Sequence, residues 1–465
     1  MIRRQWLVFF VVLCAIHEMT GAQEWKPAPA PLMTRWAKDV TPDNVWPEYP
    51  RPQMVRDDWQ NLNGLWDYAI RPKEEQKPTS WDGKILVPFC VESALSGVGK
   101  AVKPTERLWY RRTFQKPRAD ADGRVLLHFG AVDWETTVWV NGKELGRHTG
   151  GYDPFTFDIT DALRDGENEI VLAVWDPTDT GYQPRGKQVL EPKGIWYTAV
   201  TGIWQTVWLE VVPAQYIASL KLVPDVDHQL LRVTVDAPAG LEVEVQASFD
   251  GQTVAQSRGT TGKVVELKIA NPKLWWPDEP NLYDLAVKLV KDGQVLDQVT
   301  SYFGMRKVSV EKDENGINRL MLNGKFIFQL GPLDQGWWPD GLYTPASDEA
   351  MKYDLVMTKS FGMNMARKHV KYEPDRWYYW CDKLGLLVWQ DMPSGNVNRS
   401  EEGRANFRRE LKAMIDARFN HPSIIMWVPF NEGWGQHDTC DVVGWIKEYD
   451  PSRVVNEASG WHDNG

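Results

Sequence analysis

The feature that most constrains this chain is an apolar run over residues 424–430 that leads directly into Asn431, Glu432 and a loop with Gly433 and Gly435. Such a run is typical of a strand that is buried on both faces of a parallel sheet. The carboxyl ends of parallel strands form the mouth of a (β/α) barrel, where active sites are built. We therefore expect Glu432 to lie at a barrel mouth.

Two aromatic residues stand close to Glu432 in the sequence. Trp427 and Trp434 flank it, and apolar surroundings raise the pKa of a carboxyl group so that it can donate a proton near neutral pH. The pattern favours Glu432 as a general acid. The alternative is a carboxylate that caps the following helix or forms a surface ion pair, and the Asn–Glu pair and the two aromatics argue against it.

Residues 307–465 alternate between strand and helix patterns. Strands are predicted over 325–330, 363–367, 386–390, 424–430 and 453–456. The helices between them are predicted from Ser347 to Gly362, from Pro374 to Gly385, around Phe407, Leu411, Met414 and Ile415, and around Val442, Ile446 and Tyr449. An eight-stranded barrel takes about 250 residues. We therefore expect residues 307–465 to be the N-terminal part of a TIM barrel that continues beyond Gly465.

The part of the chain before residue 307 shows the alternation of all-β domains. Residues 55–212 contain short strands such as 124–129 and 136–140, and the Asn141-Gly142 pair that follows is a strong hairpin-turn signal. This region predicts a jelly-roll sandwich. Residues 213–306 repeat the pattern with strands over 230–235, 241–247, 264–269 and 283–290, which predicts a smaller immunoglobulin-like sandwich.

The N-terminus has the features of an export signal. Arg3 and Arg4 precede an apolar run over residues 6–16, and small residues at 20–22 offer a cleavage site. We expect a signal peptide over 1–22, an extended Pro-rich lead-in over 23–54, and a periplasmic or secreted mature protein with no membrane span. The cysteines left after cleavage, Cys90, Cys381 and Cys440, are too few for a disulfide framework.

Charge and composition limit the ligands. A net charge of −10 argues against nucleic acid and anionic membranes as partners. The 25 Trp suit carbohydrate, because sugar faces lie flat on aromatic rings, although many of them are expected to serve β-domain cores. His437, Asp438 and Cys440 offer metal-ligating groups, but Asp at a helix start more often acts as a cap. We expect no metal and no cofactor.

Several motifs in this order resemble glycoside hydrolase family 2, the family of β-galactosidases, β-glucuronidases and β-mannosidases. The resemblance covers nearly everything from residue 55 to the end. The matching stretches are LNGLW at 62–66, VPFCVES at 87–93, LWYRR at 108–112, VWVNGK at 138–143, GIWQ at 202–205, LWWPDEPNLY at 274–283, and NHPSII at 420–425 followed by Asn431-Glu432.

The resemblance implies a retaining glycosidase that removes a terminal β-linked sugar through a covalent intermediate. It implies that Glu432 is the acid/base residue, that Asn431 holds the sugar 2-hydroxyl, and that Arg367 and Asp391 form the floor and wall of the sugar pocket. His369 follows Arg367 by two positions, whereas the family often has His three positions after this Arg. Trp434 and Trp461 are expected at the pocket wall.

The resemblance also places the nucleophile on a seventh strand, beyond the end of this chain. Glu457 follows a predicted strand and an Asn, but that strand neighbours the one bearing Glu432, so substrate contact or a structural role is the expected alternative. A second reading of the whole chain is a carbohydrate-binding protein without turnover. Family members often form dimers or tetramers, so the resemblance implies a homo-oligomer.

Overall fold

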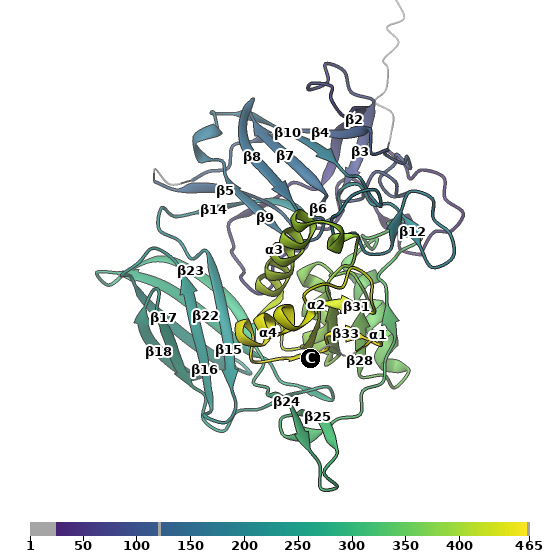
Figure 1. Cartoon of the computed structure of the whole chain (residues 1–465). Coiled ribbons are helices and arrows are strands. Elements are labelled where there is room, and N and C mark those ends of the chain that lie inside the picture. Colours follow the sequence, from purple (N-terminus) through teal and green to yellow (C-terminus); the bar gives the residue numbers. More distant parts are fainter. Residues whose placement is uncertain (1–24, 120–121, 463–465) are drawn as a thin grey trace, which may run out of the picture.

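Figure 1 shows the computed structural model of the protein, which describes residues 25–119 and 122–462. The predicted signal peptide, residues 1–22, lies outside these residues. Two β-sandwiches are followed by a parallel sheet with its helices, so the predicted combination of jelly roll, immunoglobulin-like sandwich and (β/α) barrel segment is confirmed. Within the described residues, no helix has the length and apolar character needed to cross a bilayer.

The first sandwich packs a six-stranded sheet against a four-stranded sheet. The sheet orders are β3-β2-β4-β10-β7-β8 and β1-β14-β5-β9, and apolar side chains from both sheets form one core. The strands are β1 (Trp59–Asn61), β2 (Gly64–Pro72), β3 (Gly83–Val87), β4 (Glu106–Gln115), β5 (Arg124–Phe129), β7 (Glu135–Val140), β8 (Lys143–Thr149), β9 (Phe155–Asp158), β10 (Glu167–Trp175) and β14 (Val207–Val212).

Local sequence explains the hairpin in this sandwich. Asn141 and Gly142 both have positive φ, 51° and 82°, and join β7 to β8, which confirms the predicted turn. Smaller elements extend the loops of the sandwich. They are β6 (Val132–Asp133) paired with β13 (Gly202–Ile203), β11 (Gln188–Val189) paired with β12 (Tyr197–Thr198), and the 3-10 helix η2 (Thr160–Ala162).

The second sandwich is built from three-stranded and four-stranded sheets, ordered β15-β16-β19 and β18-β17-β22-β23, around its own apolar core. Its strands are β15 (Ser219–Asp225), β16 (Leu230–Asp236), β17 (Glu242–Phe249), β18 (Gln252–Thr260), β19 (Val264–Lys268), β22 (Tyr283–Lys291) and β23 (Gln294–Phe303), with a small pair β20 (Trp275–Trp276) and β21 (Glu279–Pro280). The sandwich lies beside the parallel sheet (Figure 1).

The prediction of a barrel strand over 325–330 is wrong. Asn323 and Gly324 have positive φ and form a tight turn, so the segment folds back as β26 (Lys325–Phe326) on β25 (Asn318–Leu322), beside β24 (Val308–Lys312). The first parallel strand is β27 (Leu333–Asp334), which follows Gly331 and Pro332.

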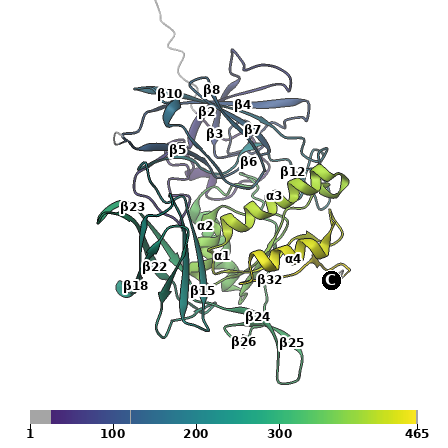
Figure 2. The same ribbon diagram turned by 60° about the vertical axis from the view of Figure 1, so that its left-hand side comes forward.

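The parallel sheet has the order β27-β28-β29-β30-β32 and is covered by four helices. Figure 2 shows α3 running between the first sandwich and the rest of the barrel segment. The further strands are β28 (Met365–Lys368), β29 (Leu387–Asp391), β30 (Ile424–Val428) and β32 (Val454–Val455), and the helices are α1 (Asp348–Ser360), α2 (Asp375–Leu384), α3 (Glu401–Arg418) and α4 (Thr439–Tyr449), with η3 (Val397–Arg399) before α3.

Capping residues set the helix ends. The Ser347 hydroxyl accepts from Ala350 N at 3.2 Å and begins α1, and the Ser400 hydroxyl does the same for α3 by accepting from Gly403 N at 3.0 Å. Gly385 adopts a left-handed conformation and ends α2 as predicted. Pro374 was predicted as the first helical residue, but its extended ψ makes it the N-cap, one position earlier.

The described part of the lead-in, residues 25–54, lies along both the first sandwich and the barrel segment. Its one regular element among the described residues is the 3-10 helix η1 (Ala37–Asp39). Trp46 Nε1 donates to Pro345 O at 3.0 Å, and Thr34 N donates to Asp340 Oδ2 at 2.9 Å. The segment therefore links the two units.

Candidate active site

Three predicted residues meet directly at the carboxyl ends of neighbouring strands. Arg367 near the end of β28 donates from Nε and Nη2 to the two Asp391 oxygens at 2.9 and 2.8 Å, and Asp391 is the last residue of β29. Arg367 Nη2 also donates to Asn431 Oδ1 at 3.1 Å. Asn431 ends β31 (Phe430–Asn431), which pairs with β33 (Ala458–Ser459) beyond β30 and β32. We call Arg367, Asp391 and Asn431 the floor.

His369 joins the floor despite its unusual spacing from Arg367. Its Nδ1 lies 3.1 Å from Asp391 Oδ2, and Val370 N donates to the same oxygen at 3.2 Å. Asp391 is completely buried, and a buried carboxylate is stable only when it is paired and hydrogen-bonded. The floor meets this requirement with one guanidinium, one imidazole and one main-chain amide.

The floor also fixes the orientation of Asn431. Because its Oδ1 accepts from Arg367, its NH2 group remains the donor end of the amide. A donor at this position can hydrogen-bond a sugar hydroxyl.

Glu432 follows Asn431 at the edge of the floor, but its predicted enclosure is wrong in one respect. Trp427 is buried and donates from Nε1 to Asp450 Oδ2 at 2.8 Å, so its ring belongs to the core and not to the site. β30 ends at Val428, so the regular alternation of its side chains does not continue to Glu432. The side chains of Trp427 and Glu432 therefore need not lie on the same side of the sheet. Glu432 is exposed and has a positive φ of 53°.

Left-handed backbone is uncommon for a residue with a side chain and occurs often at functional sites. In this chain it turns the backbone directly after the floor, between β31 and the loop that carries Trp434. Glu432 is therefore exposed on a turn directly after the floor, and we call this turn the rim of the site.

Trp434 forms part of this rim together with a residue that the sequence did not indicate. Trp196 of the first sandwich meets Trp434 edge to face, with ring centres 5.2 Å apart. The Arg185 guanidinium lies 5.2 Å from the Trp196 ring centre and 5.5 Å from that of Trp434. Lys187 lies 5.3 Å from the Trp196 ring and within the electrostatic range of Glu432. No motif or spacing in the sequence distinguishes these residues.

The loop that carries Arg185 and Lys187 is attached to the barrel segment through its backbone. Arg185 N and Gly186 N both donate to Ser394 O, at 3.0 and 2.9 Å, and Pro184 forms a bridge with Gly395 after β29. Gly186 has φ +62°, and a Cβ there would lie 2.6 Å from Val370 O. The first sandwich therefore contributes directly to the rim of the site.

Trp461 is the last predicted site residue. Its side chain is 54% exposed, and its indole lies about 3 Å from where a Cβ on Gly433 would stand. It is therefore beside the loop after Glu432, while Glu457 lies between β32 and β33. The structure brings Arg367, His369, Asp391 and Asn431 into one network and places Glu432, Trp434 and Trp461 around its edge.

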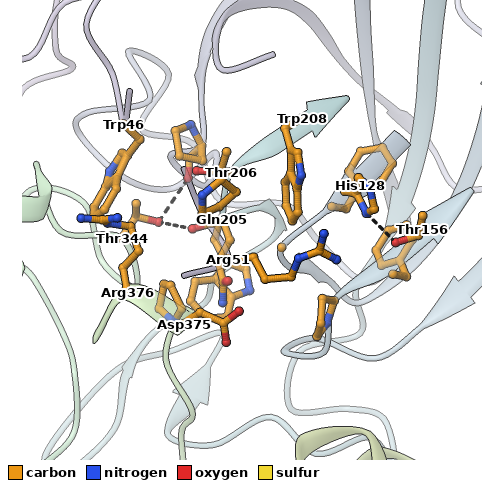
Figure 3. Close-up of a pocket in the computed structure, with 18 of the residues that line it drawn as sticks. Trp46, Arg51, His128, Thr156, Gln205, Thr206, Trp208, Thr344, Asp375 and Arg376 are labelled. Carbon is orange, nitrogen blue, oxygen red and sulfur yellow. Dashed lines mark hydrogen bonds between the residues drawn. The ribbon is translucent and has the colours of Figure 1, made fainter. Parts of the chain in front are cut away.

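A separate cavity of about 150 Å³ lies between the first sandwich and the barrel segment (Figure 3). None of the seven predicted site residues lines it. Its charged groups are already paired, because Arg51, Arg376 and Arg418 contact Glu210, Asp348 and Asp375. The cavity is thus a feature of the contact between the two units.

The metal-ligating groups near α4 do not form a metal site. His437 Nδ1 lies 2.8 Å from Gly435 O, and the ring contacts Phe407 and Phe430. Across residues 25–119 and 122–462, no group of three or more His, Cys, Asp or Glu side chains is placed to hold a metal ion.

The chain is similar to known proteins in both sequence and structure. The chain matches three family models, "Glycosyl hydrolases family 2, sugar binding domain" at residues 59–213, "Glycosyl hydrolases family 2" at 215–306, and "Glycosyl hydrolases family 2, TIM barrel domain" at 344–464. Among solved structures, the chain is similar to a β-glucuronidase of Ruminococcus gnavus, with a TM-score of 0.76, 21% identity, and coverage of 89% of this chain and 74% of that one.

Curated relatives include a putative β-glucuronidase of Formosa agariphila, 32% identical over 70% of this chain and 39% of the relative. A β-galactosidase of Thermoanaerobacter pseudethanolicus is 30% identical over 71% of this chain and 45% of the relative. The chain thus spans about two-fifths of the length of the curated relatives it matches. With all three models matching in order, the chain belongs to glycosyl hydrolases family 2.

Proposed function

We propose that this protein is a glycoside hydrolase that removes a terminal β-linked sugar with retention of configuration, and that the described residues supply the sugar-binding floor and the proton donor. The observation that carries the proposal is the direct contact of Arg367, Asp391 and Asn431 at the carboxyl ends of parallel strands, with Glu432 next in the chain. Barrel enzymes build their active sites at this end of the sheet.

Each residue has a role in the proposed reaction. The NH2 group of Asn431 donates to the 2-hydroxyl of the bound sugar, a contact that strengthens as positive charge develops on the sugar ring. Glu432 donates a proton to the leaving oxygen and then accepts one from the attacking water. The reaction also needs a nucleophile, which in retaining enzymes is a carboxylate about 5 Å from the acid/base residue.

The relatives support two sugars, because their names divide between β-glucuronidase and β-galactosidase. A panel of aryl β-glycosides, assayed with the protein expressed from its complete reading frame, identifies the sugar. We infer that the substrate is an oligo- or polysaccharide bearing one of these residues at its non-reducing end.

Replacing Glu432 by Gln tests the assignment of the proton donor. On a substrate with a poor leaving group, E432Q should lower kcat/KM by about 10² or more, because that oxygen needs a proton to depart. On a dinitrophenyl glycoside, whose leaving group needs no proton, the first step should be nearly unaffected. The exposed Glu448 on α4 provides the control variant E448Q.

Two results would contradict the proposal. Near-parental turnover of the poor-leaving-group substrate by E432Q removes Glu432 from the reaction. Carbohydrate binding without any hydrolysis by the complete gene product instead supports the alternative of a binding protein without turnover.

We also propose that the protein is exported and acts as a homo-oligomer. Arg3, Arg4 and the apolar run over 6–16 support export. N-terminal sequencing of the mature protein should find Gln23 or a close neighbour first, and recovery of uncleaved protein from the cytoplasm would contradict export. Light scattering tests the oligomeric state.

A further inference from the structure

Lys187 is an unpaired cation at the rim of the candidate site. Within the described residues, its ammonium group has no hydrogen-bond acceptor and no carboxylate within ion-pair distance, and it lies 5.3 Å from the centre of the Trp196 ring. By contrast, Arg367 forms an ion pair with Asp391, and Lys368 forms ion pairs with Asp334 and Glu373. The three N–H donors of Lys187 are therefore available to a ligand.

Hydrogen bonds hold the segment around Lys187 in place on both sides. Tyr197 N donates to Lys187 O at 2.9 Å, and the preceding Arg185 and Gly186 are bonded to Ser394 O. On the other side, Gln188 Nε2 donates to Asp133 Oδ2 at 2.7 Å, and Gln188 Oε1 accepts from Val200 N at 2.7 Å. A cation on so firmly anchored a segment loses less conformational freedom when it binds an anion.

The charges around Lys187 also favour an anion. The buried guanidinium of Arg185 lies over the same Trp196 ring, and Asp179 and Arg399 both act electrostatically on it. Glu432 is the carboxylate that acts on Lys187. Lys187 is half-buried, and this burial lowers its pKa although Glu432 raises it. In a chain of net charge −10, the cations Arg185, Lys187 and Arg399 here outnumber the carboxylates Asp179 and Glu432.

We propose that Lys187 binds a negatively charged substituent, a carboxylate or a sulfate ester, on the sugar residue that leaves the active site. This inference rests on the proposed function, because it takes Glu432 as the donor to the leaving oxygen. Lys187 contacts Trp196, which meets Trp434 in the loop after Glu432. The side chains of Arg367, Asp391 and Asn431, which are proposed to hold the sugar whose bond breaks, contact one another instead. The loop of the first sandwich thereby selects acidic glycans.

Equilibrium binding tests the inference without turnover. The ligands are S-linked disaccharides, which are not hydrolysed, with galactose or glucuronic acid as the first sugar and glucose, glucuronic acid or 6-sulfated glucose as the second. Calorimetry on the protein from the complete reading frame gives each Kd. The variant is K187Q, and K193Q, an exposed lysine on the same loop, is the matched control.

For a fixed first sugar, the parent and K193Q should bind an acidic second sugar about fivefold more tightly than glucose, the effect of one partly exposed ion pair. K187Q should reduce this preference to about one, and raising the NaCl concentration to about 1 M should weaken it in the parent. A preference confined to glucuronic acid or to the sulfated sugar identifies the anion.

The inference is overturned if the parent shows no preference, if K187Q retains it, if K193Q loses it equally, or if none of the disaccharides binds. The proposed function fails in a different way. Unchanged acidic preference together with absent hydrolysis would contradict the hydrolase proposal and leave an anion-binding rim.

Discussion

Each of the two sandwiches contacts the barrel segment at a buried carboxyl group, but the hydrogen-bond partners of the two groups differ. The first sandwich meets α3 at Glu410, whose Oε1 accepts from Asn406 Nδ2 at 2.7 Å and, at a long 3.5 Å, from Trp134 Nε1. The second meets α2 at Asp382, where Tyr302 OH and His421 Nδ1 both lie 2.7 Å from Oδ2 and Ser423 N donates to Oδ1 at 2.9 Å. Both carboxyl groups are almost fully buried.

The difference shows how partners decide the charge of a buried carboxyl group. Burial, followed by repulsion from Asp153, raises the pKa of Glu410 to about 8, because its contacts with Arg409 and Asn406 do not compensate. At the other contact, burial lowers the pKa of His421, but Asp382 and Asp375 raise it more, so its pKa lies above the usual value. One contact favours a neutral acid and the other favours an ion pair.

The largest expected effect is at the second contact. Asp382→Asn removes the carboxylate that accepts hydrogen bonds from Tyr302, His421 and Ser423. Breaking a buried ion pair such as the one between Asp382 and His421 costs about 3–5 kcal/mol. Urea unfolding measures the loss in the free energy of unfolding. The control is D278N, an exposed aspartate in the same region, which should change stability by less than about 0.5 kcal/mol. Equal effects of the two substitutions would show that the Asp382 network contributes nothing.

The first contact should make stability depend on pH. The folded state keeps the Glu410 proton up to a pKa of about 8, whereas the unfolded chain releases it near pH 4.3. The folded state therefore binds more protons in this window, and the free energy of unfolding falls as pH rises from about 5 to about 8. Glu410→Gln should reduce this fall by roughly 1–3 kcal/mol.

Urea unfolding of the parent and E410Q at pH 5 and pH 8 measures that difference, with E448Q as the matched surface control. If E410Q and the parent lose the same stability between these two pH values, Glu410 is not a neutral acid in the folded protein, and the two contacts are more alike than the geometry indicates.

The smallest expected effect sharpens the second contact. Tyr302→Phe removes one donor to Asp382 but leaves His421 and Ser423 in place, so unfolding should become easier by about 1–2 kcal/mol. The Asp382→Asn and Tyr302→Phe effects should not add in the double variant, because both act on the same oxygen. Full additivity would argue against a shared network.

Much of the fold follows from local sequence. The predicted strand over 124–129 is the observed β5, and Ser347, Asn141-Gly142 and Gly385 mark element ends because their caps and turns need those residue types. The prediction of a barrel strand over 325–330 was wrong because the Asn323-Gly324 turn folds this segment back on β25 despite its apolar character. A short apolar run fits an antiparallel hairpin as well as a parallel strand.

The candidate site was predictable only in part. The floor residues lie at strand ends, so the strand pattern and the family motif identified Arg367, Asp391 and Asn431. The position of Trp427 was wrong because side-chain alternation does not continue past Pro429. The rim residues Arg185, Lys187 and Trp196 depend on contacts such as Pro184 with Gly395, across more than 200 positions, and no local pattern encodes such a contact.

The tight fit at Gly186 has a consequence for engineering. A Cβ at this position would lie 2.6 Å from Val370 O and about 3 Å from the hydroxyls of Tyr152 and Tyr343. The loop of the N-terminal sandwich and the barrel segment are therefore closely packed at the entrance to the candidate site. A chimera that joins this barrel to another family member's sandwich would replace this loop as well, and the new loop would have to fit the same narrow space.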